Sequence, residues 1–144
     1  MNQMQIEHRF VEFIPSTLES GVLYVSMEYG TATHLCACGC GNKVVTPITP
    51  TDWQLFYDGE SVTLQPSIGN WSFPCESHYW IRASSVEWAP KWSKHMIEDG
   101  RVNDHHAKSR YFDEKNASND IKIEDRTGTF ERLKTWFKNL FKRQ

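Results

Sequence analysis

The 144-residue sequence lacks several features that would place it in a special class of protein. It has no apolar run near the roughly 18 residues that a membrane-spanning helix requires. Its first 15 residues do not show the basic and then apolar pattern of a secretory signal peptide. Charge of one sign does not dominate, since 16 Lys and Arg face 18 Asp and Glu. We therefore expect a cytoplasmic protein that does not bind nucleic acid.

What the sequence does contain is enough apolar material for a core. Hydrophobic residues make up 39% of the chain and aromatic residues 13%, with six tryptophans. This composition excludes global disorder, and the length suits one ordinary domain with a short appendage.

Charge and periodicity divide the chain into three parts: residues 1–90, 91–125 and 126–144. The first part has short runs of alternating apolar and polar residues separated by turn signals such as Asp58-Gly59. The expected strands are residues 6–13, 21–26, 43–48, 53–57, 61–65, 78–82 and 86–88. We predict a mainly β fold, a small antiparallel sheet, sandwich or barrel, with helices following it at the C-terminal side.

The second and third parts differ in charge. Pro90 and Ser93 are typical of a helix start, so we predict a helix from Lys94 followed by a polar, solvated linker up to residue 125. Residues 126–144 contain six basic residues and one acidic residue, a net charge of +5, with apolar residues at helical spacing. This basic amphipathic helix either contacts a membrane surface or a partner, or docks its apolar face on the β-domain.

The four cysteines are unevenly distributed. Cys36, Cys38 and Cys40 lie within five residues, in a loop that also contains two glycines, and Cys75 lies much later. In a reducing compartment such clustering favours a metal site over disulfides. Zinc is held by four thiolate or imidazole ligands in a tetrahedron, so we predict a zinc site that stabilises the β-domain.

The ligand set has alternatives. All four cysteines suffice for a closed structural site, and we choose them as the ligands. His34 or His78 could replace one cysteine, and free, partly buried thiols are the alternative to any metal site.

Serine and histidine residues near this motif are candidates for nucleophilic catalysis, which needs a hydroxyl within hydrogen-bond reach of a base. Ser77 and His78 are neighbours, and neighbours in a strand point to opposite faces of the sheet. Ser67 could therefore pair with His78, or Ser77 with His34. The sequence does not decide between these serines. The carboxylates that could orient the histidine are Asp52, Asp58 and Glu76.

Together these motifs resemble a small bacterial family that was long described as a domain of unknown function. They are CACGCG at 36–41, PS at 66–67, CESHYWI at 75–81 and VEW at 86–88. The sequence departs from the family pattern at Ala37, where the family often has proline. The resemblance extends over about residues 5–100.

The resemblance implies an activity and a partner. The family is often encoded beside the enzymes of bacterial ubiquitin-like conjugation, and is regarded as zinc-containing peptidases of the serine type. We therefore expect a peptidase that processes or deconjugates a ubiquitin-like protein at its C-terminal tail, with Ser67 or Ser77 as nucleophile, His78 as base and a structural zinc. The alternatives are a zinc metallopeptidase, which the absence of an H-E-x-x-H motif disfavours, and a non-catalytic, zinc-stabilised protein-binding module.

Overall fold

The computed structural model describes residues 4–140, and within its helix the side chains are described up to residue 119 and at 132–134. The chain divides into two compact units, Met1–Asp99 and Gly100–Gln144. The first unit contains all the named strands, and the second contains most of the helix.

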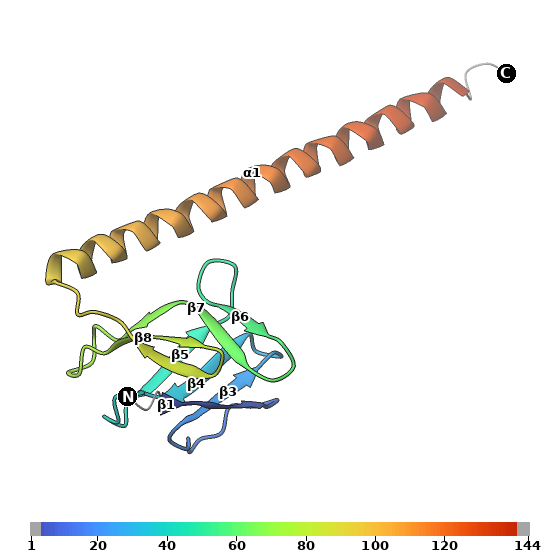
Figure 1. Cartoon of the computed structure of the whole chain (residues 1–144). Coiled ribbons are helices and arrows are strands. Elements are labelled where there is room, and N and C mark those ends of the chain that lie inside the picture. Colours follow the sequence, from blue (N-terminus) through green and yellow to red (C-terminus); the bar gives the residue numbers. More distant parts are fainter. Residues whose placement is uncertain (1–3, 141–144) are drawn as a thin grey trace. The chain divides into compact units, whose positions relative to one another are not determined.

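The first unit contains two β-sheets (Figure 1). In the four-stranded sheet the order is β2-β3-β4-β5, with bounds Glu7–Phe10 (β2), Val22–Ser26 (β3), Thr31–Leu35 (β4) and Lys43–Pro47 (β5). In the five-stranded sheet the order is β1-β9-β8-β7-β6, with bounds Met4–Gln5 (β1), Gln54–Tyr57 (β6), Val62–Gly69 (β7), His78–Arg82 (β8) and Ser85–Trp88 (β9).

The predicted mainly β fold is confirmed. The named strand pairs are antiparallel, as expected, except that β2 pairs with β3 in parallel, in the register Glu7↔Val22. The chain passes from one sheet to the other between β1 and β2. Ile6, at this crossing, is 3% exposed and donates its backbone N–H to the Ser84 carbonyl.

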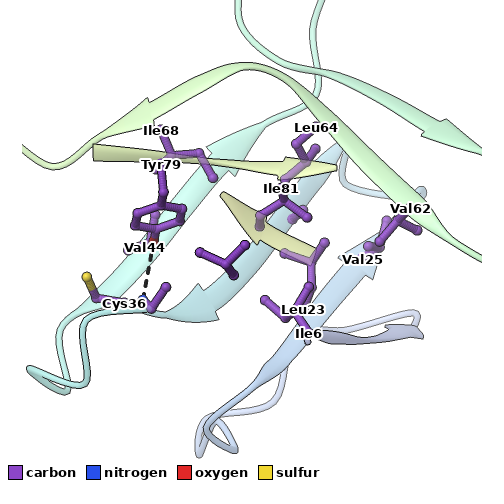
Figure 2. Close-up of a cluster of buried hydrophobic side chains, with 13 residues drawn as sticks. Ile6, Leu23, Val25, Cys36, Val44, Val62, Leu64, Ile68, Tyr79 and Ile81 are labelled. Carbon is purple, nitrogen blue, oxygen red and sulfur yellow. Dashed lines mark hydrogen bonds between the residues drawn. The ribbon is translucent and has the colours of Figure 1, made fainter. Parts of the chain in front are cut away.

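The hydrophobic core joins the two sheets (Figure 2). Leu23 and Val25 enter it from β3, while Leu64 and Ile81 enter it from β7 and β8. Because side chains alternate along a strand, the residues between these positions face the other way. The five-stranded sheet therefore has one apolar face in the core and one outer face that is free for chemistry.

One strand differs from what the sequence pattern predicts. Residues 31–35 form β4, and their sequence TATHL has no apolar alternation. Its central residues, Ala32, Thr33 and His34, are all buried, so side chains on both faces of β4 are covered. When both faces of a strand are buried, its residues no longer alternate between apolar and polar, so a search for alternation does not find the strand.

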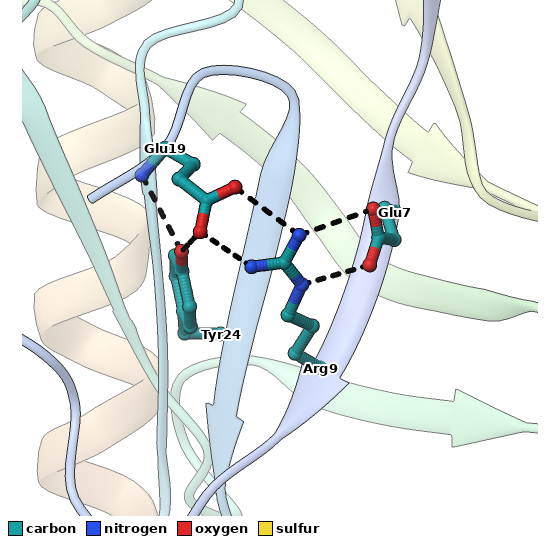
Figure 3. A network of polar contacts seen from close by, with 4 residues as sticks. All are labelled: Glu7, Arg9, Glu19 and Tyr24. Atoms are coloured by element: carbon teal, nitrogen blue, oxygen red, sulfur yellow. Dashed lines mark hydrogen bonds and ion pairs between the residues drawn. The ribbon is translucent and has the colours of Figure 1, made fainter.

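A polar network ties the edge strand β2 to β3 (Figure 3). The guanidinium of Arg9 donates to Glu7 at 2.7 Å and to Glu19 at 2.5 Å, and the Tyr24 hydroxyl donates to Glu19 at 3.2 Å. Hydrogen bonds from Arg9 lower the pKa of both carboxyl groups. Exposed ion pairs contribute little to stability, so the network mainly fixes the parallel register.

A helix, α1, spans Lys94–Leu140. It begins where the sequence predicts, since the Ser93 hydroxyl accepts the Met96 backbone N–H at 3.3 Å as an N-cap. The polar stretch at 99–125, expected to follow the helix as a linker, is itself helical. Asp104 and Lys108 form an i,i+4 ion pair of 3.0 Å, a type of pairing that supports a polar helix without an apolar face. The C-terminal part is thus one helix, whereas the sequence predicts several.

The basic segment 126–144 falls largely outside the described side chains. Those expected to form its apolar face, Phe130, Trp136, Phe137, Leu140 and Phe141, are among the residues not described, and Leu133 is 49% exposed. Docking and surface contact therefore both stay predictions. Within residues 4–140, no helix is long and apolar enough to cross a membrane.

Candidate active site and cysteine cluster

The geometry of the site begins with a bulge in β7. Leu64 pairs with Ile81 and Ile68 pairs with Tyr79, so β7 uses two more residues than β8 between the same two pairs. A bulge re-aims the side chains of its strand, and it tolerates residues that cannot join the hydrogen-bonded ladder.

Pro66 and Ser67 occupy this bulge. Proline suits the position because it has no backbone N–H to donate to β8. Leu64 and Ile68, on either side of the bulge, both stay in the core, whereas Ser67 lies on the outer face of the sheet beside His78.

His78, the first residue of β8, lies beside this serine. Its Nε2 is 2.9 Å from Ser67 Oγ, and the residue is only 5% exposed. The two side chains come together because β7 and β8 are antiparallel partners, with Gly69 paired to His78. Of the two serine–histidine pairings that the sequence leaves open, the structure brings together Ser67 and His78.

Three tryptophan rings surround the imidazole of His78. The ring centroids of Trp71 and Trp92 both lie 4.9 Å from that of His78, and the Trp80 centroid lies 5.7 Å away. Burial lowers the pKa of His78 below its usual range, so the imidazole is neutral at pH 7 and its Nε2 can accept a proton.

The other nitrogen of His78 has no carboxylate partner. Nδ1 is buried and makes no hydrogen bond of full geometry within residues 4–140. The backbone carbonyl of Pro90 nevertheless favours the protonated ring, and so partly offsets the lowering of the His78 pKa by burial. Of the carboxylates expected to orient the ring, Asp52 accepts from Thr49 Oγ1 at 2.6 Å, and Asp58 accepts the backbone N–H of Ser61 at 2.6 Å. Glu76 is exposed in a turn, with φ of 42°.

Trp71 reaches His78 by lying across Gly69. A Cβ at Gly69 would overlap the Trp71 indole, so glycine is required for the ring to occupy this place. Trp71 also stacks on Trp92, with centroids 5.5 Å apart and planes at 20°. The Trp71 ring can therefore lie beside His78 only because residue 69 is a glycine.

A hollow of about 320 Å³ opens on the same outer face. It is lined by Asp52, Gln54, Gln65, Pro66, Trp80 and Arg82. Pro66 directly precedes Ser67, and Trp80 contacts His78, so the hollow adjoins the serine–histidine pair. Its polar lining can bind the amide groups of an extended peptide.

The four cysteines form the second centre. Cys36, Cys38 and Cys40 lie between β4 and β5, and Cys75 lies between β7 and β8. All four are free thiols, and their sulfur atoms lie within 4.8 Å of one another. The predicted clustering is confirmed.

The sulfur spacing fits a tetrahedral metal. Zinc–sulfur bonds of about 2.3 Å place tetrahedral sulfurs about 3.8 Å apart. The sulfur atoms of Cys36 and Cys75 are 4.0 Å apart, those of Cys40 and Cys75 are 3.7 Å apart, and those of Cys36 and Cys38 are 3.3 Å apart. The backbone N–H of Asn42 lowers the pKa of Cys40 to about 6, which favours the thiolate that a metal binds. The residues present can hold a metal ion through four sulfurs.

The remaining candidates, Ser77 and His34, lie on the core side. Ser77 Oγ is 3.1 Å from Cys36 Sγ, and the serine is turned away from its neighbour His78. His34 Nε2 is 2.8 Å from the Tyr79 hydroxyl, and burial lowers the pKa of His34 to about 4. The structure brings neither Ser77 and His34 together nor either histidine into the group of sulfur ligands.

Sequence reasoning misses Trp92 and the side chain of Asn70. Trp92 contacts His78, and Asn70 donates to Ser77 Oγ at 2.9 Å. Asn70 directly follows Gly69, which pairs with His78, but this register is not visible in the sequence. Trp92 lies in a segment without regular structure, where no periodicity could have placed it.

A half-buried serine lies within hydrogen-bond distance of a histidine on the outer face of a small two-sheet domain, which is the contact that a serine nucleophile and its base require. Residues 10–89, more than half of the chain, match a family described as the bacterial ubiquitination-like system serine protease (BubE). The chain belongs to this family. Searches of curated proteins and of solved structures find no match.

Proposed function

We propose that this protein is a serine peptidase that cleaves after the C-terminal tail of a ubiquitin-like protein, with Ser67 as nucleophile and His78 as general base. The observation that carries the proposal is the 2.9 Å contact between His78 Nε2 and Ser67 Oγ on the outer face of the sheet. Membership of the protease family supports the reaction class and the kind of partner.

The reaction begins with proton transfer from Ser67 Oγ to His78 Nε2 as Oγ attacks the carbonyl carbon of the scissile bond. When the tetrahedral intermediate collapses, His78 returns the proton to the leaving amine and an ester on Ser67 remains. Water then attacks the ester and gives a proton to His78, which passes it to Ser67 Oγ as the ester bond breaks and the tail leaves with a free carboxyl group. His78 performs each transfer because its lowered pKa keeps it neutral before the reaction.

The three tryptophans and the hollow support the binding of an extended tail. The rings of Trp71, Trp80 and Trp92 exclude water around His78. Gln54 and Gln65, opposite each other in the β6–β7 register, offer donors and acceptors to the peptide groups of the tail. The same site would accept the precursor of the ubiquitin-like protein and its conjugates, since both present this tail.

The cysteine cluster is proposed as a structural zinc site. Cys36, Cys38, Cys40 and Cys75 would hold the ion, which supplies a cross-link between the β4–β5 loop and the β7–β8 loop. Four thiolates fill the tetrahedron and leave no position for water or substrate, so the metallopeptidase alternative is disfavoured.

The test is cleavage of a fusion between a ubiquitin-like protein and a short C-terminal extension. The zinc-loaded full chain is compared with Ser67→Ala, His78→Ala and Ser77→Ala, with the exposed Ser72→Ala as matched control. We expect the first two variants to lose at least about 10³-fold in kcat/KM and the control to match the wild type.

Three results would contradict the proposal. Cleavage that survives Ser67→Ala would exclude Ser67 as nucleophile. A loss confined to Ser77→Ala, with zinc still bound, would move the nucleophile to the other serine. A wild-type chain that binds the fusion and never cleaves it would establish the non-catalytic binding module.

A further inference from the structure

Ser77 has a polar environment of its own that the peptidase reaction does not use. Its Oγ lies 3.1 Å from Cys36 Sγ and 3.5 Å from Cys75 Sγ, and the residue is 6% exposed. A buried hydroxyl between two sulfur atoms is positioned to act on the cysteine cluster and not on a substrate.

Asn70 fixes the direction of this hydroxyl. Its Nδ2 donates to Ser77 Oγ at 2.9 Å, and it also lies 3.7 Å from Cys36 Sγ. An amide NH₂ group is a donor only, so Ser77 Oγ accepts from Asn70 and keeps its own proton for another acceptor. The nearest sulfur, that of Cys36, is the acceptor at hand.

The backbone holds both residues in place. The Asn70 backbone N–H donates to the Ser77 carbonyl at 2.8 Å, across the open end of the β7–β8 connection. Asn70 is 7% exposed, so bulk water does not displace either side chain at the cluster. The arrangement is therefore built into the fold.

We propose that Ser77 and Asn70 form the outer coordination sphere of the metal site, with the Ser77 hydroxyl donating a hydrogen bond to the Cys36 thiolate. This inference rests on the zinc site of the proposed function. Four thiolates around one dication leave an excess of negative charge in a partly buried place. A hydrogen bond to sulfur withdraws part of that charge and orients the ligand, so Ser77 is a positioning residue for metal binding.

This role also explains why two serines lie near one histidine. Ser67 and Ser77 are on opposite sides of the five-stranded sheet, one beside the imidazole and the other beside the sulfurs. Of the adjacent residues Ser77 and His78, the first thus belongs to the cysteine cluster and the second to the serine–histidine pair.

The test measures zinc affinity, which is independent of peptidase activity. The full chain is stripped of metal under reducing conditions and titrated with Zn²⁺ in competition with a chromophoric chelator. Wild type is compared with Ser77→Ala and Asn70→Ala, and with Ser67→Ala as the matched control on the outer face. Removal of an outer-sphere partner typically lowers metal affinity about 10–100-fold, and we expect a loss in this range for Ser77→Ala.

A second measurement separates an altered site from general loosening of the fold. With Co²⁺ in place of Zn²⁺, we expect the thiolate-to-cobalt charge-transfer bands of Ser77→Ala to shift, and those of Ser67→Ala to stay at the wild-type positions. Should Ser77→Ala fail to fold, Asn70→Ala supplies the same comparison with a smaller expected loss.

The outcomes are distinguishable. If the wild type binds zinc tightly and neither variant weakens it by more than about two-fold, the outer-sphere role is wrong while the metal site stands. If the wild type does not bind zinc, both the inference and the proposed metal site are wrong. The cleavage of the fusion substrate decides the peptidase proposal separately.

Discussion

Ser77 and His78, adjacent residues at the start of strand β8, face opposite sides and meet different chemistry. On the core side, Ser77 contacts the sulfur of Cys36, within a set of polar groups that cross-link two loops. On the outer side, His78 contacts Ser67 among tryptophan rings. The alternation of side chains at the start of this strand therefore separates the proposed metal site from the proposed catalytic pair.

The comparison teaches that proximity in sequence is a poor guide to shared function within a strand. The pair Ser77-His78 looks like a catalytic dyad in the sequence, yet the partner of His78 lies eleven residues away at Ser67. Substitutions on the core side should affect metal content and folding, and those on the outer side should affect only catalysis or substrate binding.

The largest contrast is expected between Cys75→Ser and His78→Ala. We expect Cys75→Ser to lose bound metal and to lower the melting temperature by more than about 10 °C, because the cross-link to the β7–β8 loop is lost. His78→Ala should keep its metal and lose at least about 10³-fold in kcat/KM. Metal analysis, thermal unfolding and cleavage rates on the same preparations check this contrast, and a metal-free His78→Ala would break it.

A smaller effect is expected from Gly69→Ala. The new methyl group overlaps the Trp71 indole, so the ring must leave its place against His78. Misplacement of a catalytic group by about 1 Å costs on the order of 10²-fold, and we expect a roughly 10- to 100-fold loss in kcat. Cleavage kinetics together with zinc analysis measure this, with the exposed Ser72→Ala as the control. Unchanged kcat would mean that Trp71 does not position the histidine.

The fold is largely predictable from the sequence and the site only in part. The cysteine cluster can be found because three of its members lie within five residues and the chain has one other cysteine, Cys75, to complete a set of four. The Ser67–His78 contact depends on the β7–β8 register and on a bulge, neither of which a local pattern specifies. β4 escapes prediction because burial of both faces removes its alternation. The length of α1 escapes prediction because its polar stretch has no apolar periodicity, although i,i+4 pairs such as Asp104–Lys108 support a helix there.

The pH dependence of cleavage tests the protonation state of His78. His78 must be neutral to accept the Ser67 proton, and burial lowers its pKa below the ordinary value of 6.5. Its neutral form, and with it kcat/KM, is therefore present at pH 7 and is lost only as pH falls below 6.5. We expect the acidic limb of the kcat/KM profile to have its midpoint below 6.5, measured with metal content held constant. A midpoint above 6.5 would contradict the buried, neutral base.

The smallest effect is expected in the hollow. Gln65→Ala removes amide groups that can bind the substrate backbone and leaves the Ser67–His78 contact untouched. Loss of about one hydrogen bond corresponds to a rise in KM of about five-fold, with kcat unchanged. Initial-rate kinetics test this, with the exposed Val45→Ala of the other sheet as control. An unchanged KM would place the tail elsewhere.

The most direct test of the division between the two centres is the site at which a fluorophosphonate probe reacts with the zinc-loaded full chain. Peptide mass spectrometry reads the modified residue without any assumption about the natural substrate. We predict a single adduct on Ser67, lost in His78→Ala because the serine is no longer activated. An adduct on Ser77, or an unmodified Ser67 in a protein that cleaves its fusion substrate, would contradict the assignment of one serine to each centre.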